Sequence, residues 1–161
     1  MKPIVLATDG SPSAAEATLK AVELARTLGA PLVAVAVEHV ELPSYGYFGY
    51  AQIYAEAAKM ERKHVDDTLA QTEKIAEEAG VECEVAHMTG LVVDAICEVA
   101  RERDAEMIVI GAHGWGLVRR TIHGSISTGV THEADCPVLV VRGGPETLLA
   151  TPALDEAVIT S

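Results

Sequence analysis

Residues 108–127 read IVIGAHGWGLVRRTIHGSIS, a short β-branched run followed by two glycine corners. Gly111 ends the apolar run, Gly114 follows it after two residues, and Gly124 with Ser125 comes later. Glycines let the main chain turn sharply and let a ligand approach it closely. Free N–H groups and the dipole at a helix start favour an anion. The stretch therefore predicts a strand, a loop that holds phosphate and the start of a helix.

Apolar runs and amphipathic segments alternate along the rest of the chain. Strands are expected at residues 4–8, 32–37, 81–88, 107–110 and 137–142, and further helices at 12–28, 59–79, 91–103 and 125–134. The run at 32–37 is continuously apolar, which favours a parallel strand buried on both faces. The sequence therefore predicts an α/β fold, a single doubly wound domain whose five-stranded parallel sheet is flanked by four helices.

The first helix has two candidate starts. Ser11 can cap it with Pro12 at the first helical position, whereas Ser13 with Glu16 offers a capping box. Gly29 is expected to end this helix.

Two segments lack helical or strand periodicity. Residues 38–58, which include the aromatic and glycine-rich stretch SYGYFGY at 44–50, are expected to form a long loop. Residues 143–161 are expected to be a C-terminal extension of a domain that spans 1–142.

Composition excludes some classes of function. The chain has 161 residues, which suits one domain, and a formal net charge of −12, which argues against nucleic-acid binding through a basic face. No apolar run reaches the roughly 18 residues of a membrane span. The start shows no signal peptide, so a cytoplasmic location is expected. Cys83, Cys97 and Cys136 are widely spaced and are expected to be buried, inert thiols.

Strand ends locate the expected crevice. Asp9 follows the first strand and Gly111 ends the fourth, and ligands of such sheets bind at carboxyl ends where the strand order switches. The glycine pattern is not a P-loop, which requires Gly-Lys-Ser or Gly-Lys-Thr, and it is not the GxGxxG dinucleotide fingerprint.

The pattern does match G-x2-G-x9-G-[ST]. Together with IVLATDGS at 4–11, DAEMIVIG at 104–111 and CPVLVV at 136–141, it makes the chain resemble the universal stress protein family over about residues 2–142. The resemblance implies an adenine nucleotide alpha hydrolase-like fold with ATP, or AMP or ADP, in the crevice. It also implies a homodimer through the apolar edge strand formed by Val138, Leu139, Val140 and Val141.

The resemblance also assigns roles by position. Ala7, Thr8 and Asp9 match the segment that contacts adenine and ribose, and Val37 matches a residue whose main chain reads the adenine edge. Asp9 is also a possible Mg²⁺ ligand, and its alternative role is that of a turn residue.

The glycine stretch supplies the remaining matches. Gly111 and Gly114 match the loop around ribose and phosphate. His113 lies between them as a candidate nucleotide-binding residue, and its alternative role is that of a loop-surface residue. The phosphates would be wrapped by Gly124, Ser125, Ile126 and Ser127, whose N–H groups and hydroxyls can donate. Ser125 has an alternative role as a helix N-cap.

The leading hypothesis is a cytoplasmic, dimeric ATP-binding module of the stress response that acts on an unknown protein partner. A slow ATPase or phosphotransferase is the second hypothesis, and it rests on Asp9 with Arg119 and Arg120. The third is a dimeric adaptor that acts independently of nucleotide, and it rests on the aromatic stretch at 45–50 and the C-terminal extension. The sequence shows no catalytic triad or metal-ligand cluster, so no residue is assigned a catalytic role.

Overall fold

The computed structural model describes residues 1–39, 51–114 and 124–142. Its strands are β1 (Ile4–Ala7), β2 (Leu32–Glu38), β3 (Cys83–Thr89), β4 (Met107–Gly111) and β5 (Val138–Val141). Its helices are α1 (Pro12–Leu28), α2 (Ala51–Glu78), α3 (Val92–Glu102) and α4 (Ser125–Glu133).

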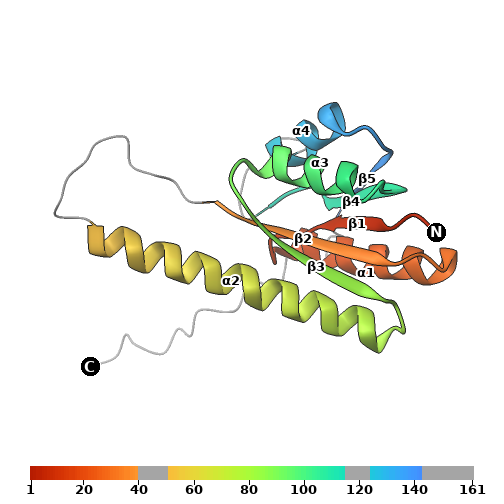
Figure 1. Cartoon of the computed structure of the whole chain (residues 1–161), viewed down its shortest axis with the longest axis horizontal. Helices are drawn as coiled ribbons and strands as arrows, with labels where there is room; N and C mark the ends of the chain where they lie inside the picture. The colour runs from red at the N-terminus through yellow and green to blue at the C-terminus, as the bar shows by residue number, and fades with distance from the viewer. Residues whose placement is uncertain (40–50, 115–123, 143–161) are drawn as a thin grey trace, which may run out of the picture.

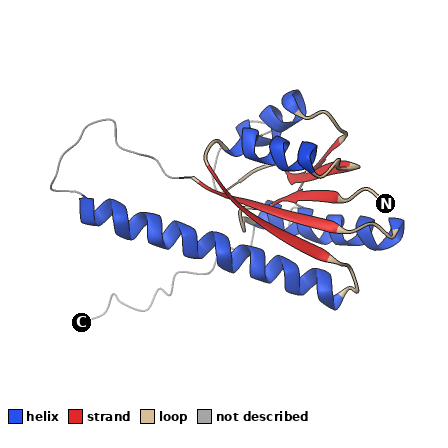
Figure 2. Ribbon diagram, in the orientation of Figure 1, coloured by secondary structure: helices blue, strands red, loops and turns tan. Residues whose placement is uncertain are grey.

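The strands form one parallel sheet in the order β3-β2-β1-β4-β5. Helices α1 and α2 cover one face of this sheet, and α3 and α4 cover the other (Figures 1 and 2). The predicted doubly wound α/β fold is therefore confirmed. Because the chain leaves β1 in one direction toward β2 and returns on its other side as β4, the strand order switches between β1 and β4.

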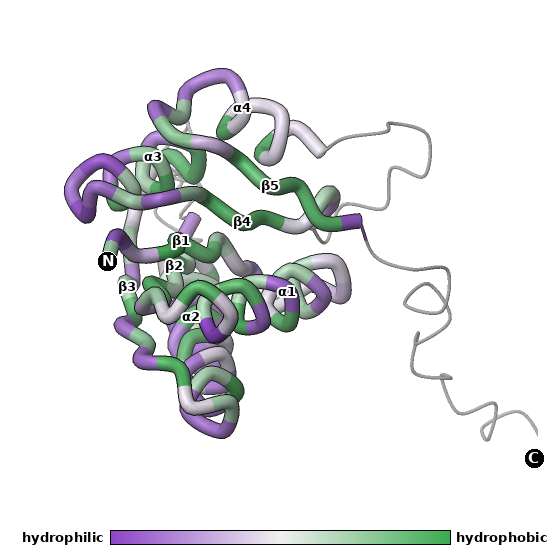
Figure 3. The backbone as a smooth tube through the Cα atoms, turned by 90° about the vertical axis from the view of Figure 1, so that its right-hand side faces the viewer, coloured by the Kyte–Doolittle hydropathy of each residue, from purple (hydrophilic) through white to green (hydrophobic). Residues whose placement is uncertain are grey.

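The central strands β1, β2 and β4 are buried against helices on both faces, as continuous apolar strands require, whereas the edge strands β3 and β5 are partly exposed. The face toward α3 carries Val5, Val33, Val35, Ile108 and Ile110. The opposite face carries Ile4, Leu6, Leu32 and Val109, which meet Ala17, Ala21 and Ala25 of α1. Because alanine side chains are small, this stripe lets α1 lie close to the sheet. Figure 3 shows the hydrophobic residues of the strands in green.

The start of α1 is set by Ser11. Its side-chain oxygen accepts a hydrogen bond from the main-chain N–H of Ala14 over 3.2 Å, and Pro12 is the first helical residue. The capping box from Ser13 is therefore wrong. Gly29 ends the helix with a φ of 66°, in the left-handed region that only glycine adopts without strain.

The predicted loop at 38–58 is too long at both ends. Glu38 belongs to β2, and α2 begins at Ala51 rather than at residue 59. Side chains at 52–57 are exposed all round the helix, so this part has no apolar stripe that a periodicity could reveal. In Figure 1 the first turns of α2 extend beyond the sheet. The aromatic stretch at 44–50 and the extension at 143–161 lie outside the described residues.

Helix α2 is long, but it is not apolar. Within the described parts of the chain, no helix has both the length and the hydropathy that crossing a membrane requires.

Candidate functional site

A cavity of about 710 Å³ opens at the carboxyl ends of β1, β2 and β4, next to the switch in strand order. The predicted site residues all line it, although they come from four separate parts of the sequence. They are Ala7, Thr8, Asp9, Val37, Gly111, His113, Gly114, Gly124, Ser125, Ile126 and Ser127. A cavity of this size suits a nucleotide-sized ligand.

The turn after β1 presents Asp9 to the cavity. Its Oδ1 accepts a hydrogen bond from the main-chain N–H of Ser11 over 2.9 Å, so the residue does shape the turn. A Cβ atom at Gly114 would lie 2.7 Å from Asp9 Oδ2. An added Cβ atom at position 114 would therefore displace the carboxylate from this place at the cavity wall.

Helix α2 contacts the same turn through His64 and Thr68. The Nε2 atom of His64 lies 2.9 Å from the carbonyl oxygen of Asp9, which makes the ring nitrogen the donor. Gly10 has a φ of +74°, and a Cβ there would come within 2.8 Å of Thr68 Oγ1. The turn thus needs glycine both for its backbone conformation and for its contact with α2.

Gly111 is required for packing as well as for the cavity. A Cβ atom there would lie 2.8 Å from the carbonyl carbon and oxygen of Ser13 in α1. The sequence interpretation of this glycine as a ligand corner missed that contact, because nothing in the sequence places α1 against the end of β4.

The start of α4 is tied back to the end of β4. The N–H of Gly124 donates to the carbonyl of Ala112 over 2.8 Å. The hydroxyl of Ser127 lies 3.2 Å from that carbonyl oxygen and 3.0 Å from the carbonyl oxygen of Gly124, and the side chain is buried. The Ser127 hydroxyl therefore donates inside the protein, and its expected donation to phosphate is not supported.

The first turn of α4 lies on the cavity wall. Its N-cap is Gly124, so Ser125 is the first helical residue and not the cap, and no described side chain caps the helix. The first N–H groups of a helix have no partner within the helix. These main-chain donors are a suitable place for an anion.

The cavity also has an apolar wall that the sequence prediction of the site did not include. It consists of Val35, Val92, Ile96 and Ile110, and Ala14, Ala112, His39 and Glu61 complete the lining. Val92 and Ile96 belong to the apolar face of α3 that points to the sheet. The sequence predicts that they are buried, but it does not show that α3 lies beside the cavity.

The main chain of Val37 points toward the cavity. Two residues earlier, the carbonyl of Val35 accepts a hydrogen bond from Thr8 N over 2.9 Å, so Val35 faces β1. Residues two apart on a strand point the same way. Since β1 ends at Ala7, the N–H and C=O of Val37 face the space where β1 has turned away.

The described lining contains no lysine or arginine, and its ionisable side chains are Asp9, His39, Glu61 and His113. Arg119 and Arg120 lie outside the described residues. In the described parts of the chain, no three histidine, cysteine, aspartate or glutamate side chains are grouped to hold a metal ion. Phosphate would therefore depend on main-chain donors.

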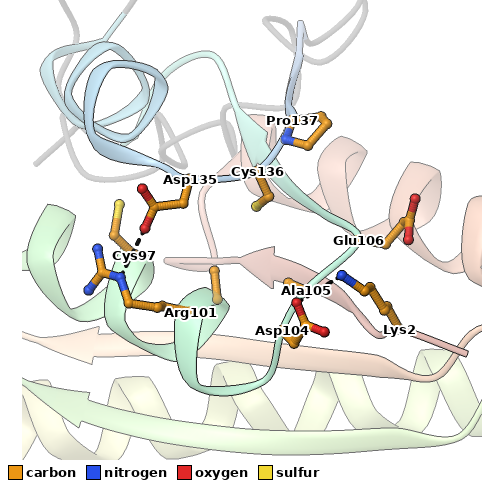
Figure 4. A pocket seen from close by; sticks show the side chains of 10 residues that line it. Lys2, Cys97, Arg101, Asp104, Ala105, Glu106, Asp135, Cys136 and Pro137 are labelled. Atoms are coloured by element: carbon orange, nitrogen blue, oxygen red, sulfur yellow. Dashed lines mark hydrogen bonds and ion pairs between the residues drawn. The ribbon is translucent and has the colours of Figure 1, made fainter.

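A second cavity, of about 310 Å³, lies at the opposite, amino ends of the strands (Figure 4). Its cations are paired with acids: Lys2 Nζ lies 2.8 Å from Asp104 Oδ1, and Arg101 Nε lies 2.9 Å from Asp135 Oδ2. None of the predicted site residues lines this cavity.

All three cysteines are free thiols, but only Cys97 is buried as expected, whereas Cys83 and Cys136 are partly exposed. Burial raises the pKa of the Cys83 thiol to about 11, and it also raises the pKa values of Cys97 and Cys136. Thiols with raised pKa values are poor nucleophiles at neutral pH, which agrees with the inert role expected for them.

The sequence model of the universal stress protein family matches residues 1–142, which include every strand and helix described above. A universal stress protein of Methanocaldococcus jannaschii is 33% identical over 145 residues, which cover 88% of this chain and 82% of that protein. Universal stress protein UspA of Lactobacillus plantarum has a similar structure, with a TM-score of 0.78 at 24% identity and coverage of 88% and 97%. The Archaeoglobus fulgidus universal stress protein solved with dAMP gives a TM-score of 0.58 at 27% identity, with coverage of 88% and 98%.

Proposed function

The chain belongs to the universal stress protein family, and we propose that it binds an adenine nucleotide, with ATP as the main ligand, in the cavity beside β1 and β4. The observation that carries this proposal is the convergence of an apolar wall and an uncapped helix start on one cavity. The apolar wall suits an aromatic base, and the uncapped helix start suits a phosphate group. The dAMP complex of the Archaeoglobus fulgidus relative supports an adenine nucleotide as the ligand.

The base would lie against the apolar wall formed by Val92, Ile96 and Ile110. Its edge would meet the N–H and C=O of Val37, which supply one donor and one acceptor side by side. The amino group and ring nitrogen of adenine match that pair, whereas guanine presents a carbonyl oxygen and a ring N–H in the same places.

The ribose would lie beside Asp9, whose carboxylate accepts hydrogen bonds from hydroxyl groups. The phosphates would lie on the main chain of Gly114 and of residues 124–127, including Ser125 and Ile126. Because the described lining has no lysine or arginine, Mg²⁺ would neutralise a triphosphate, with Asp9 as a candidate ligand and water or phosphate oxygens as the others.

We further propose that the protein acts as a homodimer in the cytoplasm and that nucleotide occupancy regulates its partners. Strand β5 lies at the edge of the sheet, and Leu139 on it is 37% exposed. An exposed apolar edge strand is a pairing surface. Free thiols suit a reducing compartment. Light scattering at micromolar concentration is expected to give the dimer mass, and Leu139→Lys to give the monomer mass; a monomeric wild-type chain would contradict the dimer.

Nucleotide selectivity tests the proposed function. Protein stripped of copurified small molecules should melt at a higher temperature with ATP and Mg²⁺, with AMP and with ADP than with GTP or CTP. Gly124→Val should remove the rise, because a Cβ at Gly124 already meets the Ala112 carbonyl oxygen at 3.0 Å and displaces the start of α4. Equal shifts with every nucleotide, or no shift with any, would refute an adenine site.

A further inference from the structure

A buried carboxylate stands directly behind the cavity. Glu38 is the last residue of β2, and its side chain is only 2% exposed although it is charged. Its neighbours Val37 and His39 both line the cavity, whereas Glu38 itself faces α2 on the other side of the sheet. The same short piece of strand therefore carries cavity wall on one face and a charged cluster on the other.

Three donors hold the carboxylate of Glu38. The guanidinium of Arg62 in α2 reaches it with two nitrogens, Nε to Oε2 at 3.2 Å and Nη2 to Oε1 at 3.4 Å. The Nε2 atom of His87 in β3 lies 3.2 Å from Oε2. On its other side, His87 Nδ1 lies 2.8 Å from Oδ1 of Asp66 in α2. The cluster Glu38–Arg62–His87–Asp66 thus joins β2, β3 and α2.

The end of β2 has few other supports. Its main chain pairs with β1 only as far as Val35, opposite Ala7, because β1 then turns away. Beyond that point β2 pairs with β3 alone, through Val37 opposite Met88 and Glu38 opposite Thr89. The side chain of Glu38 therefore supplies an anchor where the sheet lacks one on the β1 side.

We propose that the cluster Glu38–Arg62–His87–Asp66 positions the β2 end of the nucleotide cavity, and that affinity for nucleotide depends on the charge of His87. This inference rests on the proposed function and deepens it. The groups of the cluster are positioning residues, because they act through the main chain of Val37 and the lining residue His39.

The dependence on His87 follows from the donor count. Ionised carboxylates only accept hydrogen bonds, so His87 can bond to Asp66 and Glu38 together only when both ring nitrogens carry hydrogen. Glu38 is ionised, since the hydrogen bonds from Arg62 hold its pKa below the ordinary value. The charged groups that contact His87 are Glu38 from β2 and Asp66 from α2, and Arg62 of α2 contacts the same carboxylate of Glu38. Loss of the imidazolium proton breaks one of the two bonds, so affinity should fall as the pH rises.

Calorimetric titration with ATP and Mg²⁺ on stripped protein tests the proposal. Arg62→Met should weaken binding about tenfold, and Arg62→Lys should restore part of the affinity. Lys63→Met is the matched control, since Lys63 is the next residue on α2 and pairs only with the exposed Asp67 among the described residues. This control should bind like wild type.

The pH profile separates positioning from a purely structural role. Wild-type affinity should fall as the pH rises, because only the doubly protonated ring of His87 can donate to both carboxylates, and His87→Gln should flatten that slope. If Arg62→Met and His87→Gln lower the melting temperature but leave both affinity and its pH slope unchanged, the cluster is structural only and the inference is overturned. Wild-type protein that binds no nucleotide would overturn the proposed function itself, and the inference with it.

Discussion

At the scale of single residues, the shape of the site depends on glycines, which have no Cβ atom, as well as on the side chains that line it. Gly114 and Gly124 each stand where a Cβ would meet a neighbour at 3.0 Å or less. In one case the neighbour is the carboxylate of Asp9, and in the other it is the carbonyl of Ala112. The contact at Gly124 is with main chain and restricts that position, whereas the contact at Gly114 is with the end of a side chain that can move.

Gly114→Ala should weaken ATP binding about tenfold and leave the fold intact. The added methyl group pushes Asp9 Oδ2 aside, which is easy for the end of an exposed side chain, and stability should fall by no more than about 1 kcal/mol through the Asp9–Ser11 hydrogen bond. Calorimetry and thermal unfolding measure the two effects. In an Asp9→Ala background the same substitution should cause no further loss of affinity, and additive losses would contradict the contact.

Cys83 should be slow to alkylate. Burial raises its pKa to about 11 by removing solvent from the thiolate, so the reactive form is rare at pH 7. The rate of iodoacetamide modification of a Cys97→Ser/Cys136→Ser variant should keep rising with pH up to about 11 in the folded protein. A plateau near the ordinary thiol value of 9.0 would show that Cys83 is not shielded.

At the scale of elements, helix α4 contains a glycine that lowers its helix propensity but is needed for its packing against α3. Gly129 lowers its helix propensity, but a Cβ atom there would lie 2.8 Å from Cγ2 of Val93 in α3. The glycine is the condition for α3 and α4 to approach each other above the cavity.

The effect of Gly129→Ala on the free energy of unfolding should therefore change sign with the residue at position 93. Gly129→Ala should destabilise the protein by about 1–3 kcal/mol through overpacking against the rigid valine. In a Val93→Ala background the clash is gone, and the same change should stabilise the protein by up to about 1 kcal/mol through helix propensity. Chemical denaturation of the four proteins measures both. Stabilisation in both backgrounds would mean that α3 and α4 are not in this contact.

The end of β2 should make stability sensitive to acid. Arg62 first, and His87 after it, hold the pKa of Glu38 below its ordinary value near 4.5. A carboxyl group whose pKa is lower in the folded state adds stability at pH values above the unfolded pKa, and that contribution disappears as the pH falls. The melting temperature should therefore drop below about pH 4.5, and Glu38→Gln should reduce this drop. An unchanged drop in the variant would assign the acid sensitivity to other carboxyl groups.

At the scale of the whole molecule, the sequence predicts the sheet better than it predicts the surroundings of the cavity. Strands such as 32–37 are apolar throughout and bounded by turns, so their class and parallel arrangement follow from composition alone. The sequence does not reveal the start of α2, because the first turns of this helix bury no side chains. It also predicts a loop at Glu38, because charged residues are rarely buried in a strand.

Only part of the candidate site can likewise be predicted from the sequence. Its glycines and Asp9 are visible in the sequence because motifs preserve spacing. The apolar wall from α3, the carboxylate of Glu61 and the cluster behind β2 come together only through crossovers, so spacing carries no sign of them. The internal hydrogen bonds of Ser127 likewise depend on where α4 begins relative to β4.

A calorimetric titration of stripped wild-type protein with ATP and Mg²⁺ is the most direct test of whether this cavity binds an adenine nucleotide. We expect saturable heat with one site per chain. Binding of GTP should be at least tenfold weaker, because the donor and acceptor of Val37 do not match the edge of guanine. No heat of binding up to millimolar ATP would contradict the proposed nucleotide site.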